Sequence, residues 1–134
     1  MLHVGLRVSD LDRSLAFYKA LGYEVVGSVP ETPFGRLTML KLPDDPFVSL
    51  ELVHDAEKGA VDLGTGINHL VVKVESLTET LETLVARGVV TEQPREFDGM
   101  ATAWLTDPDG YRIELVQWPP GHPAGMTSDD FSVD

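Results

Sequence analysis

The sequence has no cysteine and few basic residues. Without cysteine among its 134 residues, the chain can form no disulfide, no thiolate metal ligand and no cysteine nucleophile. Ten lysines and arginines stand against 22 aspartates and glutamates, which gives a net charge of −12. Such a charge repels nucleic acid and anionic membranes, so we expect neither as a partner.

Long apolar runs are also missing. No stretch approaches the roughly 20 apolar residues that a membrane helix needs. The chain enters a strand-like segment at Leu2 without a basic region followed by an apolar core, so we expect no signal peptide and a cytoplasmic location. The length is typical of one domain, and the composition, 43% hydrophobic and 24% charged, is that of a globular protein.

Two common enzyme motifs are absent as well. Nothing resembles Gly-x-Ser-x-Gly, so acyl transfer by a serine nucleophile has no support. Gly64-Thr65-Gly66 lacks the third glycine and the following helix of a dinucleotide-binding loop. We therefore assign this segment to a linker.

The chain contains an internal repeat with a constant offset of 66 residues. In the first half, alternating residues 2–8 predict a strand, and Ser9-Asp10 caps a helix predicted over 11–21 that stops at Gly22. The second half repeats these elements in the same order and register. They are a strand over 69–74, a cap at 75–76, a helix to residue 87 and a stop at Gly88. The two halves therefore form a duplicated unit.

Three further strand-like runs follow each helix, so each half is predicted to be a βαβββ module. The runs cover 24–29, 37–42 and 47–53 in the first half, and 89–92, 101–106 and 111–118 in the second. The modules occupy residues 2–55 and 67–118 and together make one domain over residues 1–118. Residues 56–66 are the linker, and residues 119–134, rich in proline, glycine and acidic side chains, are expected to be a flexible acidic tail.

One histidine and one glutamate stand at equivalent places in both modules. His3 and His69 lie on the first strand of each module, and Glu51 and Glu114 lie on the last. All four fall on the face opposite the most regular apolar set of their strand. Imidazole nitrogen and carboxylate oxygen suit Ni, Zn, Co or Fe, whereas the alternative is that polar residues simply occupy solvated strand faces. The recurrence in both modules favours a metal site with these four ligands.

Other candidate residues have weaker support. His54 lies on the opposite strand face from Glu51, beside a turn, and is expected at the surface. His122 lies in the tail segment Pro-Pro-Gly-His-Pro and is expected to be solvated. Trp104 is expected in the core or in a pocket wall.

Several segments resemble glyoxalase I (lactoylglutathione lyase), a member of the vicinal oxygen chelate superfamily, which also contains bleomycin resistance proteins and dioxygenases. His3–Leu11, followed by Ser14–Tyr18 and Leu21-Gly22, is similar to the opening of glyoxalase I. Asp107–Leu115, which begins Asp-Pro-Asp-Gly, is similar to its closing motif. These motifs occur throughout the superfamily and indicate the fold more than the reaction.

The ligand set distinguishes among members of the superfamily. Extradiol dioxygenases and fosfomycin-resistance enzymes typically bind metal with two histidines and one glutamate. Methylmalonyl-CoA epimerases carry glutamine where this chain has Glu51, and bleomycin-binding relatives have lost the ligands. His3, Glu51, His69 and Glu114 together resemble the set of glyoxalase I most.

The resemblance implies an α+β fold in which two tandem βαβββ modules form an open, curved, barrel-like sheet with a metal cleft. It also implies a homodimer with shared sites, in which His3 and Glu51 come from one chain and His69 and Glu114 from the other. The implied cofactor is a divalent metal, Ni or Zn, or Co.

The implied enzyme is a lactoylglutathione lyase-like isomerase. It converts the hemithioacetal of a 2-oxoaldehyde and a thiol to a 2-hydroxyacyl thioester through an enediolate. A divalent metal stabilises the negative oxygens, and carboxylates move the proton. By resemblance, Glu114 is the principal catalytic base and Glu51 is its partner.

The substrate-binding residues that the resemblance implies are Arg7, Asp55, Arg95 and Trp104. Arg7 matches the arginine that holds the glutamyl end of glutathione in the family, but Asp55 stands where asparagine is usual. The loop Glu96–Met100 lacks the usual lysine, which leaves Arg95 as its only nearby cation. The identity of the thiol therefore stays open. An epimerase or dioxygenase of the superfamily, and a non-catalytic small-molecule or drug-binding relative, are the alternatives.

Overall fold

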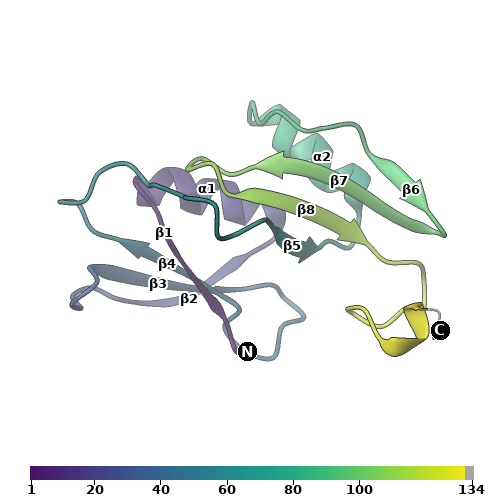
Figure 1. The fold of residues 1–134 in the computed structure, drawn as a ribbon, viewed down its shortest axis with the longest axis horizontal. Helices are drawn as coiled ribbons and strands as arrows, with labels where there is room; N and C mark the ends of the chain where they lie inside the picture. The colour runs from purple at the N-terminus through teal and green to yellow at the C-terminus, as the bar shows by residue number, and fades with distance from the viewer. Residues whose placement is uncertain (132–134) are drawn as a thin grey trace. The chain divides into compact units, whose positions relative to one another are not determined.

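The computed structural model describes residues 1–131, which divide into two compact units (Figure 1). The first unit comprises residues 1–68 together with 107–111, and the second comprises residues 69–106 and the chain from residue 112 onward. Each unit holds one α-helix and one open four-stranded sheet. The predicted duplication of a βαβββ module and the α+β class are therefore confirmed.

The first unit contains β1 (Val4–Arg7), α1 (Leu11–Leu21), β2 (Glu24–Val29), β3 (Arg36–Lys41) and β4 (Leu50–His54). Its strands lie in the order β1-β4-β3-β2, with β1 parallel to β4 and the other pairs antiparallel. The helix begins where the Asp10 side chain accepts a hydrogen bond from the Arg13 N–H, and it ends at Gly22, whose φ is 112°. Both ends of this helix agree with the prediction from sequence.

The second unit contains β5 (Leu70–Lys73), α2 (Leu77–Ala86), β6 (Arg95–Phe97), β7 (Met100–Thr106), β8 (Arg112–Gln117) and a short 3₁₀ helix, Ser128–Asp130. Its sheet repeats the topology of the first, in the order β5-β8-β7-β6 with β5 parallel to β8. The helix α2 begins at the cap Ser76 and lies against β7 and β8. No helix within residues 1–131 is long and apolar enough to cross a membrane.

The strand predicted over residues 89–92 is wrong. Within that segment, only Thr91 pairs with another strand, through an isolated bridge to Leu105. The strand that pairs with β7 along its length is β6, which begins at Arg95. A hairpin joins β6 to β7 through Asp98 and Gly99, whose φ values are +49° and +79°. Two successive residues with positive φ make the tight turn that suits a two-residue hairpin. Of the loop expected over Glu96–Met100, only Asp98 and Gly99 therefore lie outside the strands.

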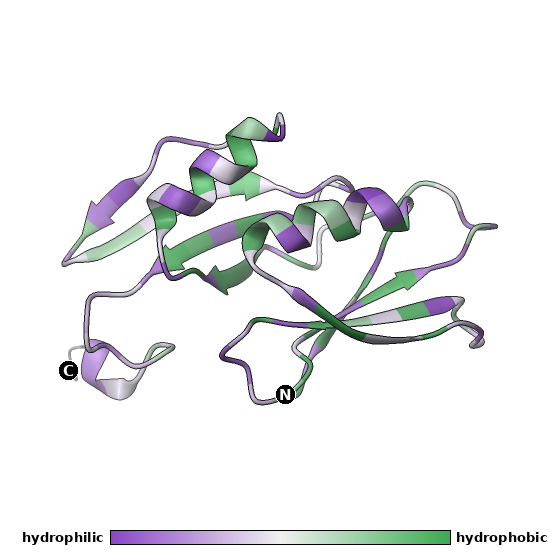
Figure 2. Cartoon of the chain, turned by 180° about the vertical axis from the view of Figure 1, so that it is seen from behind, coloured by the Kyte–Doolittle hydropathy of each residue, from purple (hydrophilic) through white to green (hydrophobic). Residues whose placement is uncertain are grey.

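A row of buried apolar residues fixes the register of each sheet. In the first unit the row consists of Leu6, Leu40, Leu50 and Leu52, and in the second it consists of Val72, Ala103, Leu105, Ile113 and Leu115. Apolar residues run along the strands, whereas the loops are mostly polar (Figure 2). Burying one leucine side chain stabilises a fold by about 1.5–3 kcal/mol, and a slip of one residue would expose the whole row.

The predicted Asp-Pro-Asp-Gly turn is built around the buried Asp107 in the first unit. Its carboxylate accepts hydrogen bonds from the Tyr18 hydroxyl at 2.7 Å and from the backbone N–H groups of Asp109 and Tyr111 at 2.8 and 2.9 Å. Burial raises the pKa of Asp107 above its ordinary value. The Tyr111 hydroxyl donates to the Arg7 carbonyl at 2.9 Å. The turn therefore connects α1 to the end of β1.

The segment after β8 folds back on itself. The His122 ring stacks on Trp118, with ring centroids 4.4 Å apart and planes 8° from parallel. His122 Nε2 lies 2.6 Å from Asp130 Oδ1, and Nδ1 lies 2.7 Å from the Pro123 carbonyl oxygen. His122 is therefore only partly solvated, with 17% of its side chain exposed and a partner at each ring nitrogen. The flexibility of the tail stays a prediction, and residues 132–134 lie outside the described residues.

Candidate metal centre

The first predicted ligand pair lies in the first unit. His3 Nε2 lies 3.6 Å from Glu51 Oε1, and the two side chains are 37% and 19% exposed. The parallel pairing of β1 with β4 places Gly5 beside Glu51. A Cβ atom on Gly5 would lie 3.2 Å from Glu51 Oε2, so the absence of a side chain there leaves room for the carboxylate. Sequence reasoning missed Gly5, although its place two residues after His3 on one strand face was a usable signal.

The second predicted pair lies at the matching place in the second unit. His69 Nε2 lies 3.5 Å from Glu114 Oε2, and the side chains are 30% and 21% exposed. Here β5 runs parallel to β8, so Val71 lies beside Glu114 just as Gly5 lies beside Glu51. Each unit thus brings together one histidine and one glutamate that are far apart in the sequence.

The distance within each pair fits two ligands of one metal ion. Metal bonds to imidazole nitrogen or carboxylate oxygen are about 2.0–2.2 Å long, so neighbouring ligand atoms on one ion lie about 2.8–3.6 Å apart. The observed 3.6 and 3.5 Å lie at the upper end of this range. Both distances are longer than about 2.7–3.2 Å, the usual range for an N–H···O hydrogen bond. Within residues 1–131 no group of three or more such side chains is gathered, so each pair offers two ligands.

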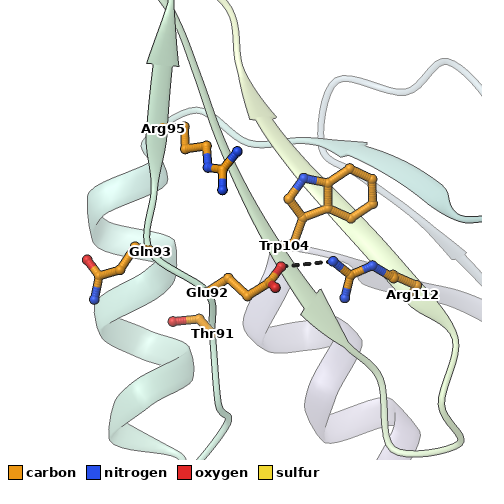
Figure 3. Close-up of a pocket in the computed structure, with 6 residues that line it drawn as sticks. All are labelled: Thr91, Glu92, Gln93, Arg95, Trp104 and Arg112. Carbon is orange, nitrogen blue, oxygen red and sulfur yellow. Dashed lines mark hydrogen bonds and ion pairs between the residues drawn. The ribbon is translucent and has the colours of Figure 1, made fainter.

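A pocket of about 600 Å³ lies in the second unit (Figure 3). It is lined by Thr91, Glu92, Gln93, Arg95, Trp104 and Arg112. Arg112 donates to Glu92 Oε2 at 2.9 Å, and its guanidinium carbon lies 4.8 Å from the centroid of the Trp104 ring. Within the described residues, Arg95 makes no hydrogen bond or ion pair, and its guanidinium group faces the pocket. The structure therefore brings two of the predicted substrate-binding residues, Arg95 and Trp104, to one pocket.

Arg7 and Asp55, the other two predicted substrate-binding residues, both contact the segment that joins the modules. The Arg7 guanidinium donates to the carbonyl oxygens of Gly59 at 3.1 Å and Ala60 at 2.6 Å. The Asp55 carboxylate accepts a hydrogen bond from the Glu57 N–H at 3.0 Å. In this structure the two side chains therefore hold the backbone of the linker.

Sequence reasoning also missed Arg112 and Glu92. Arg112 precedes Glu114 by two residues on β8, so the period of a strand places both side chains on one face. That spacing could have identified Arg112. Glu92 carried no such signal, because its contact with Arg112 depends on how the loop before β6 returns to β7.

The fold is that of one known family. Residues 1–115 match the model of the Glyoxalase/Bleomycin resistance protein/Dioxygenase superfamily, and the chain belongs to that superfamily. It is 34% identical over 124 residues to the probable lactoylglutathione lyase of Synechocystis sp., an alignment that covers 87% of this chain and 94% of that protein. The resemblance seen in the sequence is therefore confirmed.

Other relatives differ in length or identity. The chain is 32% identical over 123 residues to the probable chloroplastic lactoylglutathione lyase of Arabidopsis thaliana, but it spans only 35% of the length of that protein. Among solved structures, the trypanothione-dependent glyoxalase I of Leishmania major is similar, with a TM-score of 0.72 and 30% identity. That similarity covers 87% of this chain and 85% of the Leishmania chain. The glyoxalase-type fold is therefore confirmed.

Proposed function

We propose that this chain is a metal-dependent, glyoxalase I-like isomerase. Its substrate is the hemithioacetal of a 2-oxoaldehyde and a thiol, and its product is a 2-hydroxyacyl thioester. The observation that carries the proposal is the pair of matching His–Glu contacts, one in each module, with nitrogen–oxygen distances of 3.6 and 3.5 Å. The lactoylglutathione lyases among its relatives support the reaction class.

The residues of the site have distinct roles in this reaction. His3, Glu51, His69 and Glu114 would hold a divalent ion, Ni, Zn or Co, since nitrogen and carboxylate ligands suit these metals. When bound, the ion supplies Lewis-acid stabilisation of the negative charge that develops on the substrate oxygens. Glu114 takes the proton from the carbon that carries sulfur and returns it to the neighbouring carbon, which was the carbonyl carbon. Glu51 assists from the other carboxylate position.

The pocket in the second unit would hold the part of the substrate that does not react. Arg95 supplies a cation for an acidic group, and the half-buried Trp104 supplies an apolar wall. Arg7 and Asp55 would contact the thiol from the first unit. Because one relative is named as trypanothione-dependent and others as lactoylglutathione lyases, the thiol has to be found by experiment.

We further propose that two chains form a homodimer with shared sites. Each site would combine His3 and Glu51 of one chain with His69 and Glu114 of its partner. The two-ligand pair in each unit supports this arrangement, since a pair alone leaves half of a four-ligand set unfilled.

Metal content of the purified protein tests the site directly. The wild type should hold about one divalent ion per chain, because a four-ligand site of this kind binds one ion. Replacement of His69 by alanine should empty the site. Replacement of His54, which lies on the same strand as Glu51 but in neither pair, should leave the metal content unchanged and serves as the control. Undiminished metal in His69→Ala would show that the ligands are misassigned.

An assay on methylglyoxal with several thiols tests the reaction. The metal-loaded protein should form a thioester with at least one of glutathione, trypanothione or a smaller thiol. Metal uptake without thioester formation would favour another enzyme of the superfamily, such as an epimerase or a dioxygenase. A wild type that holds no metal would favour a small-molecule-binding relative.

A further inference from the structure

Trp104 contacts one member of the second ligand pair and lies across from the other. Its indole ring makes a T-shaped contact with the His69 imidazole, with ring centroids 4.7 Å apart and an angle of 69° between the planes. In the antiparallel pairing of β7 with β8, Trp104 is the direct partner of Glu114. Side chains at such paired positions lie close together on one face of the sheet. One aromatic ring therefore lies next to both proposed ligands.

The Trp104 ring is held by Arg112, which is held in turn by Glu92. The Arg112 guanidinium lies over the ring, at 4.8 Å from its centroid, and donates to Glu92 Oε2 at 2.9 Å. The N–H of Glu92 donates to the carbonyl oxygen of Trp104 at 2.9 Å. Figure 3 shows the ion pair of Glu92 with Arg112 beside the indole. Because Glu92 fixes the guanidinium that lies over the ring, the Arg112 contact limits the rotation of the Trp104 side chain.

The orientation of His69 decides whether its Nε2 can share an ion with Glu114. The imidazole is attached through two rotatable bonds, and most of its rotamers would turn Nε2 away from the carboxylate. The indole ring, in contact with the imidazole, blocks part of this rotation. Indole nitrogen donates a hydrogen bond and accepts none, so Trp104 can affect the ligand pair by packing but cannot replace a ligand.

We infer that Trp104, held by Glu92 and Arg112, is a positioning residue that keeps the His69 ring turned toward Glu114. It thereby raises the affinity of the pair for a divalent ion. The inference rests on the proposed metal-dependent function. Groups adjoining a metal ligand typically change metal affinity by about 10- to 100-fold, and we expect the lower end because packing is the only contact.

Four variants compared with the wild type test the role of Trp104. Trp104→Leu removes the aromatic ring, Trp104→Phe keeps one, and Arg112→Met removes the cation that holds it. Phe97→Leu is the matched control, since Phe97 is an exposed aromatic residue of the same sheet. Two readouts are measured: ¹³C relaxation of the His69 ring in metal-free protein, and Ni²⁺ affinity by competition with a chelator. Circular dichroism checks that each variant is folded.

The inference predicts a faster-moving His69 ring and about 10-fold weaker Ni²⁺ binding in Trp104→Leu. Trp104→Phe and Phe97→Leu should stay close to wild type, and Arg112→Met should shift in the same direction as Trp104→Leu by a smaller factor. Unchanged ring motion or unchanged affinity in a folded Trp104→Leu protein would overturn the inference. If Trp104→Leu fails to fold, the same two results in Arg112→Met would overturn it.

The experiment distinguishes failure of the proposed function from failure of the positioning role. A wild type that takes up none of Ni²⁺, Zn²⁺ and Co²⁺ would refute the metal-dependent function, and His69 ring motion in Trp104→Leu would then decide the positioning role by itself. A wild type that binds Ni²⁺ while Trp104→Leu behaves identically would refute only the positioning role.

Discussion

At the scale of single residues, the two glutamates have equivalent places but different surroundings. Glu51 lies beside Gly5, which leaves space at its carboxylate, whereas Glu114 lies beside Val71 and across from Trp104. Both carboxylates are partly buried, at 19% and 21% exposed. Glu114 has larger side chains as neighbours than Glu51 has in Gly5, which suits a group that must keep a fixed position while it moves a proton.

Replacement of Glu114 by glutamine should lower the turnover rate far more than it lowers metal content. The amide keeps an oxygen that can bind the ion and nearly the same volume, but it cannot accept the proton. Loss of a positioned proton-transfer group typically costs about 10²–10⁴ in rate. Steady-state kinetics and metal analysis of the same preparation measure both effects.

Glu75→Gln provides the control for this experiment. Glu75 is 77% exposed and pairs with Lys73 at 3.0 Å, outside the ligand pairs. It should keep wild-type turnover. Near-normal turnover in a metal-loaded Glu114→Gln enzyme would remove Glu114 from the mechanism.

At the scale of elements, the segment after β8 folds back on itself through the contact of His122 with Asp130. Both ring nitrogens of His122 face oxygen acceptors, the Asp130 carboxylate and the Pro123 carbonyl. Both contacts are hydrogen bonds when each nitrogen carries a proton, so they favour the imidazolium form of the ring. The hydrogen bond to Asp130, followed by that to Pro123, raises the pKa of His122. A hydrogen bond from the Thr127 N–H, followed by that from His122, lowers the pKa of Asp130.

These shifts predict how the closed segment responds to pH. Because the pKa of His122 is raised on folding, its contribution to stability is fully present below the ordinary imidazole pKa, about 6.5. That contribution is lost as the pH rises through the raised value. The contribution of Asp130 is present above its ordinary pKa and is lost as the pH falls through the lowered value. The segment should therefore be most stable in mildly acidic solution, between the ordinary pKa values of the two groups.

An NMR titration of the His122 ring measures this response. The Asp130→Asn variant should titrate at lower pH than the wild type, because the carboxylate that stabilises the imidazolium is gone. In the wild type, loss of the stacked Trp118 environment should follow deprotonation of His122. Identical titration curves for the wild type and Asp130→Asn would contradict the imidazolium assignment.

At the scale of the whole molecule, the duplicated module makes the sharing of sites testable. A His3→Ala variant and a Glu114→Gln variant should each have little activity. In a mixed dimer with shared sites, one site would carry both lesions and the other would carry none. A mixture allowed to exchange subunits should therefore recover activity, measured against each variant alone.

Two controls define the outcome of the mixing experiment. Exchange of subunits has to be shown by mass spectrometry of a tagged and an untagged chain. A mixture of His3→Ala with Glu51→Gln should recover nothing, because both lesions fall on the same half of the shared site and every site then carries one. No recovery in the first mixture after proven exchange would place each site within one chain.

The sequence by itself determined the local elements and the repeat of this protein. The bounds of α1, the caps of both helices and most of the strands follow from short-range patterns, because capping residues and alternating apolar positions act over a few residues. The offset of 66 residues and the family motifs are also visible in the sequence alone. They identified the superfamily and proposed His3, Glu51, His69 and Glu114 before any distance was known.

Only the tertiary structure decided which side chains meet. The parallel pairing of the first and last strand of each module brings His3 to Glu51 and His69 to Glu114, across 48 and 45 residues of chain (51 − 3 and 114 − 69). The position of β6, the closure of Trp104 by Glu92 and Arg112, and the stacking of His122 likewise depend on how distant backbone segments pair. Local propensity carries no information about such contacts. They stabilise the fold only after strand pairing has brought the two segments together, which costs the entropy of closing the loop between them.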